Sequence, residues 1–172
     1  MSAMLDQLRS FWTERRQVVA DKFNRHLPFG DYVVDRWEKA AALGFGEGTS
    51  IYDSAHVFGD VSVGDRTWIG PFCVLDGSGQ LSIGSNCSIS AGVQIYSHDT
   101  VAWAISGGTA PYVYAATHIG DNCYIGPNCV IAKGVTIGSG CVIGAGSLVL
   151  NDIGAGQKAW GSPAKATGPA YE

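Results

Sequence analysis

The chain has few charged residues and no long apolar run. Asp, Glu, Lys and Arg make up 15% of its 172 residues and leave a formal net charge of −4, whereas soluble domains average roughly 25% charged residues. This acidic balance argues against a nucleic-acid partner, since general nucleic-acid binding needs an excess of basic side chains. No apolar run approaches the roughly 20 residues that span a bilayer, so membrane association is not expected.

Paired cysteines and a leader-like N-terminus are also missing. The five cysteines form no Cys-x-x-Cys pair, and their number is odd. This usage fits a reducing compartment better than a disulfide framework. The first residues lack the basic and then apolar order of a signal peptide. The sequence therefore predicts a cytoplasmic protein.

Glycine, by contrast, is abundant, and its positions follow a repeat. The 24 glycines are about twice the average share of roughly 7%. Counting in sixes from Ile51, the leading position stays aliphatic, with a two-residue slip near Leu81 and a break before Ile119. The fourteen leading positions are Ile51, Val57, Val63, Ile69, Leu75, Ile83, Ile89, Ile95, Ile119, Ile125, Ile131, Ile137, Ile143 and Val149. A fixed period of this kind determines the architecture.

Two further columns of the repeat keep their character. The fourth column favours Asn and Gly, which tolerate left-handed backbone and so suit corners: Asn86, Gly92, Asn122, Asn128, Gly134, Gly140 and Gly146. The fifth column is small or β-branched, and it holds all five cysteines: Cys73, Cys87, Cys123, Cys129 and Cys141. We interpret these cysteines as core packing rather than as metal ligands or nucleophiles.

A six-residue period with one large and one small inward position predicts a parallel β-helix with three sides. Three hexads make one coil, and each coil packs on its neighbours. Neither the 3.6-residue period of an α-helix nor the two-residue period of an ordinary strand fits. We expect an all-β solenoid over residues 51–160, an N-terminal helical segment over 1–50 and a C-terminal tail over 161–172. The period alone leaves the handedness open.

The residues before the repeat have helical spacing. Apolar residues recur among charged ones and predict an amphipathic helix over about 3–24. A second helix is expected over 31–43, with Asp31 as its N-cap and Gly44 ending it. Both helices would cover an open end of the β-helix. A membrane-surface role for the first is the alternative.

The repeat loses its character over residues 101–116, where we expect a loop to leave the coil. The loop contains several aromatic residues, among them Trp103 and Tyr112. Aromatic rings on such an excursion, next to a histidine, are typical of one wall of a binding cleft. Packing against a neighbouring subunit is the alternative.

His98 is the candidate for catalysis among the four histidines. It occupies the corner column, which is rich in Asn and Gly, and stands directly before the expected loop. A histidine side chain titrates near neutral pH and, fixed on a rigid coil, suits general-base work. A plain surface histidine is the alternative. His118 directly precedes the resumed repeat and either lines the same cleft or lies on the surface.

Several segments resemble the hexapeptide-repeat acetyltransferases. Residues 90–99 (SAGVQIYSHD) resemble the active-site segment of that family, and residues 119–126 (IGDNCYIG), 131–138 (IAKGVTIG) and 144–147 (GAGS) resemble its glycine-rich donor segments. Residues 161–165 (GSPAK) match its usual ending. The chain is most similar to the branch that acetylates sugars and surface polysaccharides, and the resemblance covers about two-thirds of it.

The resemblance implies a left-handed β-helix, a homotrimer with sites between subunits, and acetyl-CoA as the acyl donor. His98 matches the catalytic base, and Asp76 lies near a position that binds or orients the acceptor. The matching positions on the donor side are Tyr124, Gly126, Ala145 and Lys165, of which Lys165 could meet a CoA phosphate. The resemblance implies a sugar or nucleotide-sugar as acceptor. We expect Trp103 and Tyr112 to shape the pocket that binds it. No metal is implied.

Three other functions remain open at this point. The same fold carries zinc carbonic anhydrases of the γ class, which need three histidines, two of them close in sequence; no second histidine lies within five residues of His118. A non-catalytic trimeric scaffold would share the repeat. Transfer to the nitrogen of a nucleotide-linked amino sugar would use the same fold and the same base. The branch of the family that the chain resembles most indicates transfer to a sugar hydroxyl instead.

Overall fold

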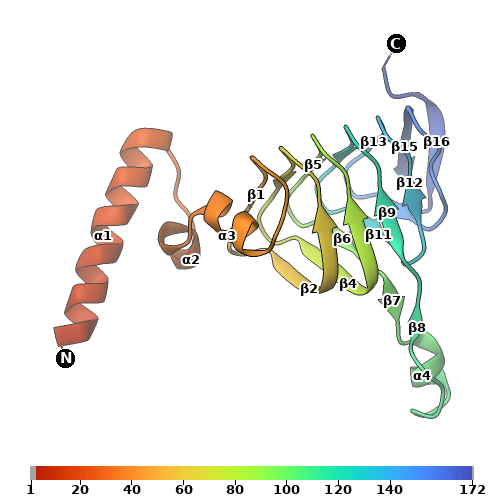
Figure 1. Ribbon diagram of the computed structural model, residues 1–172, viewed down its shortest axis with the longest axis horizontal. Helices are drawn as coiled ribbons and strands as arrows, with labels where there is room; N and C mark the ends of the chain where they lie inside the picture. Colours follow the sequence, from red (N-terminus) through yellow and green to blue (C-terminus); the bar gives the residue numbers. More distant parts are fainter. Residues whose placement is uncertain (1–2, 172) are drawn as a thin grey trace.

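The computed structural model describes residues 3–171, and over the repeat it forms a left-handed parallel β-helix, as predicted (Figure 1). Short strands stack in two parallel sheets that together wrap around three sides. The strands of the coils are β1 (Ser50–Ile51), β2 (His56–Val63), β3 (Trp68–Ile69), β4 (Val74–Ile83), β5 (Ser88–Ile89), β6 (Gln94–Ile95), β9 (Thr117–Ile119), β10 (Tyr124–Ile125), β11 (Val130–Ile131), β12 (Thr136–Ile137), β13 (Val142–Ile143) and β14 (Leu148–Val149).

Parallel register fixes how the coils stack. The first sheet has the order β1-β3-β5-β10-β13 and continues into the C-terminal strands. The second sheet turns a corner, because one half of β4 pairs with β6 while the other half pairs with β9. Ile51 lies beside Ile69, and Ile125 beside Ile143, so one coil spans 18 residues. Three hexads per coil, as predicted, account for this spacing.

The leading aliphatic column fills the interior. Of its fourteen members, all except Val57 are buried, and Val57 is half-buried near the open N-terminal end. The corner column also behaves as predicted: Asn86, Asn122 and Asn128 have φ of 56–57°, and its glycines have φ of 68–77°. Left-handed backbone at these positions lets the chain turn between faces.

The fifth column adds polar links between coils. The Cys87 thiol lies 3.1 Å from the carbonyl of Gly120 in the next coil, and the Thr67 hydroxyl donates to the carbonyl of Gly84 at 2.8 Å. All five cysteines are free and buried. A small side chain with a weak donor both fills the space and satisfies a buried carbonyl. The interpretation of the cysteines as core packing is confirmed.

The N-terminal segment contains three helices where two were predicted. The first, α1 (Ala3–Phe23), has the expected bounds. The second prediction was wrong in detail: α2 (Phe29–Val33) and α3 (Arg36–Ala42) are separated by extended backbone at Val34, and Asp35 caps α3 by accepting from two backbone N–H groups. Asp31 is not an N-cap, because its carboxylate accepts from the N–H of Asp53 at 2.7 Å.

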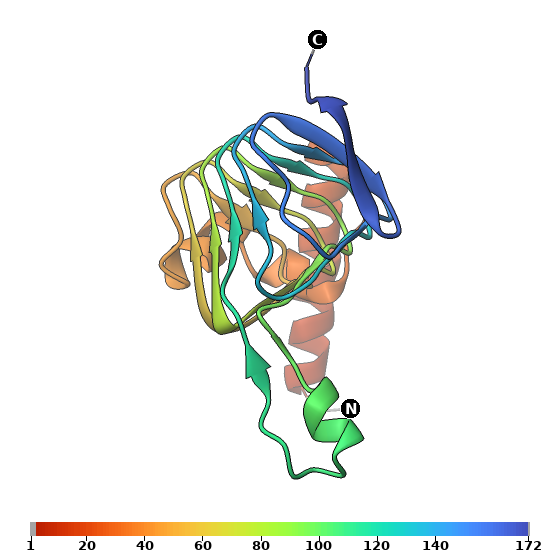
Figure 2. The ribbon, with the colours of Figure 1, turned by 90° about the vertical axis from the view of Figure 1, so that its right-hand side faces the viewer.

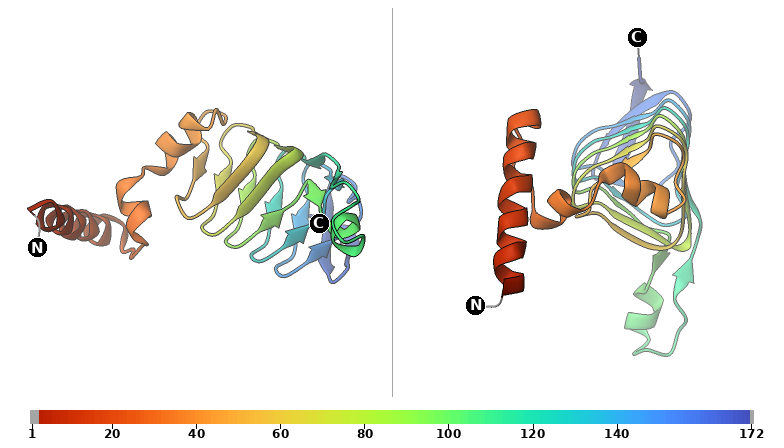
Figure 3. Two further views of the ribbon diagram at one scale, coloured as in Figure 1. Left: turned by 90° about the horizontal axis from the view of Figure 1, so that it is seen from below. Right: turned by 60° about the vertical axis from the view of Figure 1, so that its left-hand side comes forward.

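Of these helices, α3 covers the open end of the β-helix, and α2 reaches it through Asp31. α3 packs on β1, and the Lys39 ammonium donates to the carbonyls of Tyr52, Asp53 and Ala55 at 2.9–3.1 Å. α1 contacts α2 and stands away from the coils (Figure 3). The expectation that both predicted helices cover this end is therefore wrong for α1. Within residues 3–171, no helix is long and apolar enough to cross a membrane.

Two segments depart from the coils. The loop predicted over 101–116 projects from one corner (Figure 2) and begins with α4 (Val101–Ile105). Its base is a short antiparallel pair, β7 (His98–Asp99) with β8 (Val113–Tyr114). At the C-terminus, β15 (Gln157–Gly161) and β16 (Ala164–Pro169) form an antiparallel pair, so the segment expected as a tail carries a strand.

Burial predicts that the thiols are unreactive in the folded protein. Each cysteine is at most 3% exposed, and burial raises the pKa of Cys73 to about 11 despite backbone hydrogen bonds that lower it. Because the reagent must reach the sulfur atom and all five are buried, we expect almost no reaction with Ellman's reagent until guanidinium unfolds the chain, and then reaction of all five thiols. Prompt labelling of even one native thiol would contradict this packing.

Candidate active site

The candidate site lies at the corner where the chain leaves the coils. The frame slip predicted near Leu81 is a bulge in β4: between the pairs Gly59–Gly77 and Val61–Leu81, residues 78–80 of β4 face a single residue of β2. On the neighbouring coil, β6 is followed at once by β7 and the projecting loop. Two departures from the six-residue period therefore lie side by side.

His98 and Asp76 form a hydrogen-bonded pair at this corner. The Nδ1 atom of His98 lies 2.5 Å from Oδ2 of Asp76, whose side chain is only 4% exposed. A carboxylate here accepts from Nδ1–H and fixes the tautomer with Nε2 unprotonated. Within residues 3–171, Nε2 has no protein hydrogen-bond partner. The histidine side chain is 28% exposed. The ring is thus held through Nδ1, and its other nitrogen is free to meet a substrate.

The backbone around Asp76 satisfies the rest of its carboxylate. Oδ1 accepts from the N–H and hydroxyl of Ser78, at 3.0 and 2.5 Å, and Oδ2 also accepts from the N–H of Ser97 at 3.1 Å. Ser97, which is fully buried, in turn accepts from the N–H of Gly79 at 2.7 Å. A Cβ on Gly79 would lie 2.2 Å from the Ser97 carbonyl oxygen, so this close approach requires glycine. The bulge thus builds the support for His98.

Hydrogen bonding keeps Asp76 ionised. Burial alone would raise the pKa of its carboxyl, but hydrogen bonds from the Ser78 hydroxyl, the His98 ring and the backbone N–H groups of Ser78 and Ser97 outweigh burial. The pKa is lowered to about 2. The carboxylate therefore stays negative at neutral pH beneath the imidazole. Both oxygens of Asp76 are bonded to protein groups, and its expected part in binding or orienting the acceptor stays a prediction.

The loop brings aromatic rings over His98, as predicted. The Tyr114 ring stacks beside the imidazole with centroids 5.9 Å apart, and the Tyr112 ring lies at 6.5 Å. Trp103 meets Tyr112 edge to face at 5.7 Å. Trp103 and Tyr112 are each more than 40% exposed. Tyr112 thus lies beside the histidine and Trp103 lies against Tyr112, while their part in an acceptor pocket stays a prediction. The contact with Tyr114 depends on the β7–β8 pairing, which the repeat does not encode.

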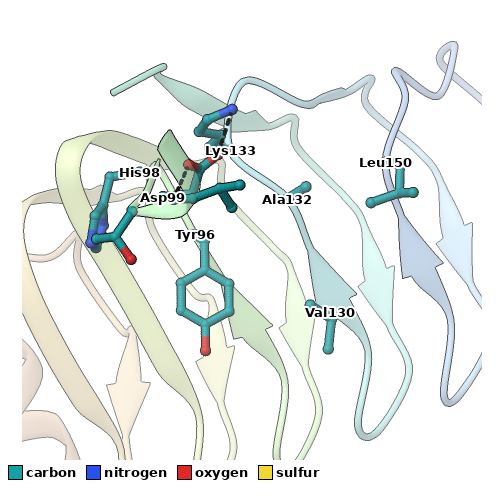
Figure 4. Close-up of a pocket in the computed structure, with 9 residues that line it drawn as sticks. Tyr96, His98, Asp99, Val130, Ala132, Lys133 and Leu150 are labelled. Atoms are coloured by element: carbon teal, nitrogen blue, oxygen red, sulfur yellow. Dashed lines mark hydrogen bonds and ion pairs between the residues drawn. The ribbon is translucent and has the colours of Figure 1, made fainter. Parts of the chain in front are cut away.

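An open groove of about 540 Å³ runs from His98 across the second sheet (Figure 4). Its lining residues are Tyr96, His98, Asp99, Thr100, Val101, Val130, Ala132, Lys133 and Leu150. The Lys133 ammonium pairs with the Asp99 carboxylate at 2.9 Å, and this bond, together with one from the Val101 N–H, lowers the pKa of Asp99. The groove was not predicted residue by residue, because outward positions of the repeat vary freely.

The four residues matched to the donor side lie apart from this groove. Tyr124 is exposed on the first sheet, paired with Ser88 and Val142. Gly126 and Ala145 lie in the turns that follow β10 and β13, and a Cβ on Gly126 would lie 2.6 Å from the Ala145 nitrogen. Lys165 is exposed on β16. One chain therefore does not bring these residues to His98.

His118 belongs to a different face. Its Nδ1 lies 2.7 Å from the Ser82 hydroxyl on β4, and it pairs with Thr136 along the third side. The His98 ring bonds to Asp76 and the His118 ring to Ser82, so the two histidines do not share a hydrogen-bond partner. Among residues 3–171, no group of three or more His, Cys, Asp or Glu side chains is placed to hold a metal ion.

Comparison with known families confirms the repeat. A family model of the bacterial transferase hexapeptide (six repeats) matches residues 116–151, and one of the hexapeptide repeat of succinyl-transferase matches residues 60–97. Both parts of the coiled region thus match hexapeptide-repeat models, and the resemblance stated from its motifs is confirmed. No curated protein matches the full sequence.

Solved structures with the same fold are acyltransferases. A hexapeptide-repeat acetyltransferase from Vibrio cholerae in complex with acetyl-CoA is 24% identical, with a TM-score of 0.68, over 99% of this chain and 91% of that one. A maltose O-acetyltransferase from Clostridium difficile is 23% identical (TM-score 0.62; 99% and 90%). An N-acyltransferase from Bacillus cereus with dTDP and 3-hydroxybutyryl-CoA is 19% identical (0.63; 79% and 90%). At these identities the likeness establishes the fold.

The lowered pKa of Asp76 predicts a pH-dependent contribution to stability. The pKa falls from an ordinary 3.8 to about 2 on folding, so the carboxylate stabilises the folded state above about pH 4, and this contribution is lost as the pH falls toward 2. Its size at neutral pH is about 2 kcal/mol. In urea unfolding at pH 7, the free energy of unfolding of Asp76→Asn should be lower than that of the parent chain by about this amount. This difference should shrink below pH 3. A difference in the free energy of unfolding that does not change with pH would contradict a lowered pKa of Asp76.

Proposed function

We propose that this protein is an acetyl-CoA-dependent acetyltransferase that modifies a hydroxyl group of a sugar or surface-polysaccharide precursor, with His98 as general base. The observation that carries the proposal is the Asp76–His98 pair, which bonds Nδ1 and leaves Nε2 without a protein partner among the described residues, on a histidine that lines an open groove. The acyltransferases that share the fold support the same class of reaction.

The geometry accounts for each proton in such a transfer. The acceptor oxygen attacks the thioester carbonyl carbon, and its proton passes to Nε2 of His98. The tetrahedral intermediate then collapses, the C–S bond breaks, and the imidazolium returns the proton to the sulfur of CoA. The acetyl ester and free CoA are the products. Because Nδ1 is held by Asp76, the ring can perform both steps in one orientation.

Asp76 acts in this proposal as a positioning residue. Its carboxylate is 4% exposed and ionised, so it stabilises the imidazolium that forms during the transfer without touching the acceptor. It also holds the ring in one tautomer through Nδ1. The hydrogen bonds from Ser78 and Ser97 prevent the carboxylate from rotating away.

The loop and the groove support a sugar as acceptor. Sugar rings present C–H faces that pack well on aromatic rings, and Tyr112 and Tyr114 offer exposed rings beside His98, with Trp103 against Tyr112. Lys133 and Asp99 place polar groups on the groove wall, where they can bind hydroxyl groups. Asp76 therefore shapes the acceptor pocket indirectly, through the imidazole that it holds.

The donor would lie between subunits of a homotrimer. Because Tyr124, Gly126, Ala145 and Lys165 lie away from His98 on one chain, they reach a reacting thioester only if a neighbouring chain supplies one of the two sides. Gly126 and Ala145 give close access to backbone, and Lys165 offers an exposed ammonium for a CoA phosphate. No metal takes part in this mechanism, and we propose a cytoplasmic location, where CoA thioesters are made.

Transfer to an amino group is the second candidate. The Bacillus cereus enzyme with the same fold is an N-acyltransferase that was solved with dTDP, and an unprotonated amine would lose its proton to Nε2 in the same way. The aromatic loop is equally able to stack on a nucleotide base. A nucleotide-linked amino sugar is therefore the alternative acceptor.

Calorimetry with acetyl-CoA tests the donor without knowledge of the acceptor. We expect binding in the micromolar range with about one molecule per chain, weakened by Lys165→Ala because a phosphate contact is lost. CoA alone should bind with similar affinity, since most contacts involve its nucleotide and pantetheine arm. Absence of detectable binding would shift the interpretation to a non-catalytic scaffold.

Substitutions at the pair test the base. Once an acceptor supports turnover, His98→Ala should lower kcat by roughly 10² or more. Asp76→Asn should lower kcat strongly but leave the KM for acetyl-CoA within about twofold, since it acts through the imidazole. His26→Ala is the matched control, because His26 is exposed in the connector between α1 and α2. Near-parent turnover in His98→Ala would exclude the mechanism.

A further inference from the structure

Phe72 combines a strained backbone with an exposed ring. Its φ is 60°, in the left-handed region, and the residue is 61% exposed. Left-handed backbone brings the Cβ atom close to the following carbonyl oxygen, which makes it an outlier for a bulky residue. Of the residues that the structure describes, the others with a side chain and left-handed φ are Asn, Arg and Gln. Phe72 is therefore the one apolar residue in this conformation.

The fold itself does not require phenylalanine at this corner. Phe72 belongs to the corner that continues through Gly92, Asn128 and Gly146, and backbone hydrogen bonds join each of these turns to the one before. Those three residues reach φ of 57–69° with side chains that tolerate it. The inward neighbour Cys73 fills the core, while Phe72 is more than half exposed. A strained residue without compensating packing indicates a role outside the fold.

The residues matched to the donor lie along the same corner. Gly126 and Ala145 occupy its turns after β10 and β13. Lys165 pairs with Trp160, and the Cβ atom of Trp160 would lie 2.9 Å from a Cβ on Gly144, directly after β13. All three matched residues thus follow one edge of the first sheet, and Phe72 lies on that edge at its N-terminal end.

This edge has the length of an extended acyl-CoA. The strand order along the first sheet is β3-β5-β10-β13-β15-β16, with Phe72 in the turn after β3 and Lys165 on β16. Five steps at the usual spacing of paired strands, about 4.8 Å, span roughly 24 Å. An extended CoA molecule has a similar reach from its 3′-phosphate to its sulfur. A phosphate held at Lys165 therefore brings the thioester to Phe72.

We propose that the Phe72 ring packs on the thioester end of the acyl donor. The inference rests on the proposed acetyl transfer, to which it adds a contact at the reactive end of the donor. The faces of the ring are apolar and suit the acetyl methyl group and the methylene groups beside sulfur. Four residues separate Phe72 from Asp76, about 13 Å of extended chain. The base that serves this thioester is therefore the His98 of a neighbouring chain, as the proposed homotrimer requires.

Calorimetry with two probes locates the ring along the donor. Acetyl-CoA spans the whole edge, whereas adenosine 3′,5′-bisphosphate carries only the nucleotide end. Phe72→Asn should weaken the binding of acetyl-CoA about tenfold, because apolar surface of the ring is no longer buried on binding. The Kd of the bisphosphate should stay within about twofold of the parent value. Lys165→Ala should instead weaken both probes, because its ammonium meets the phosphate.

The stability of the same variant separates a binding role from a structural one. Asn already occupies this corner at Asn128, with φ of 57°, so Phe72→Asn relieves the backbone strain. We expect its urea midpoint to equal or exceed that of the parent chain while its affinity for acetyl-CoA falls. Phe11→Asn is the matched control, because Phe11 is also exposed but lies on α1, away from the coils (Figure 3). This control should bind both probes as the parent does.

Several results would overturn the proposal. Equal affinity of Phe72→Asn and the parent for acetyl-CoA would exclude the contact and leave the proposed function intact. An equal loss for both probes would place the ring at the nucleotide end. A lower urea midpoint, or smaller assemblies in sedimentation, would assign the ring to the fold or to packing between chains. If the parent chain binds neither probe, the proposed function itself fails, and this inference fails with it.

Discussion

Every coil of the β-helix must return the chain to its starting point, a regular coil after 18 residues, and the site depends on this constraint. Backbone hydrogen bonds join each strand to the same strand one coil away, so additional residues can leave the coils only at corners. The bulge at residues 78–80 and the loop after His98 are two such departures, and they meet where Gly79 donates to Ser97. The proposed catalytic pair is built from the places where the period fails.

Most of the fold was accessible from the sequence because the repeat is chemically explicit. Aliphatic residues every six positions predicted the core, and Asn or Gly predicted the left-handed corners, which were found at Asn86, Asn122 and Asn128. His98 was singled out because it breaks the corner column. The bond from His98 to Asp76 was not predicted, since it depends on how the bulge turns the Asp76 carboxylate beneath the next coil.

The N-terminal segment was harder to predict, because nothing periodic fixes its place. The helix expected over 31–43 is divided at Val34, where Asp35 caps a new helix and Asp31 instead accepts from the coil. Local capping signals predict that helices start, but they do not tell which of two acidic residues binds a distant backbone group. The bounds of α1 were predicted because its apolar spacing is local, whereas its separation from the coils was not.

The short antiparallel pair of β7 with β8 isolates the projecting loop from the coils. The chain leaves and re-enters the β-helix at fixed points, with the Ala115 N–H bound to the Ser97 carbonyl at 2.9 Å. Mutations, insertions and deletions at the loop tip therefore leave the support of His98 undisturbed. During evolution such a protein can acquire new substrates by exchanging one exposed segment while its chemistry is inherited unchanged.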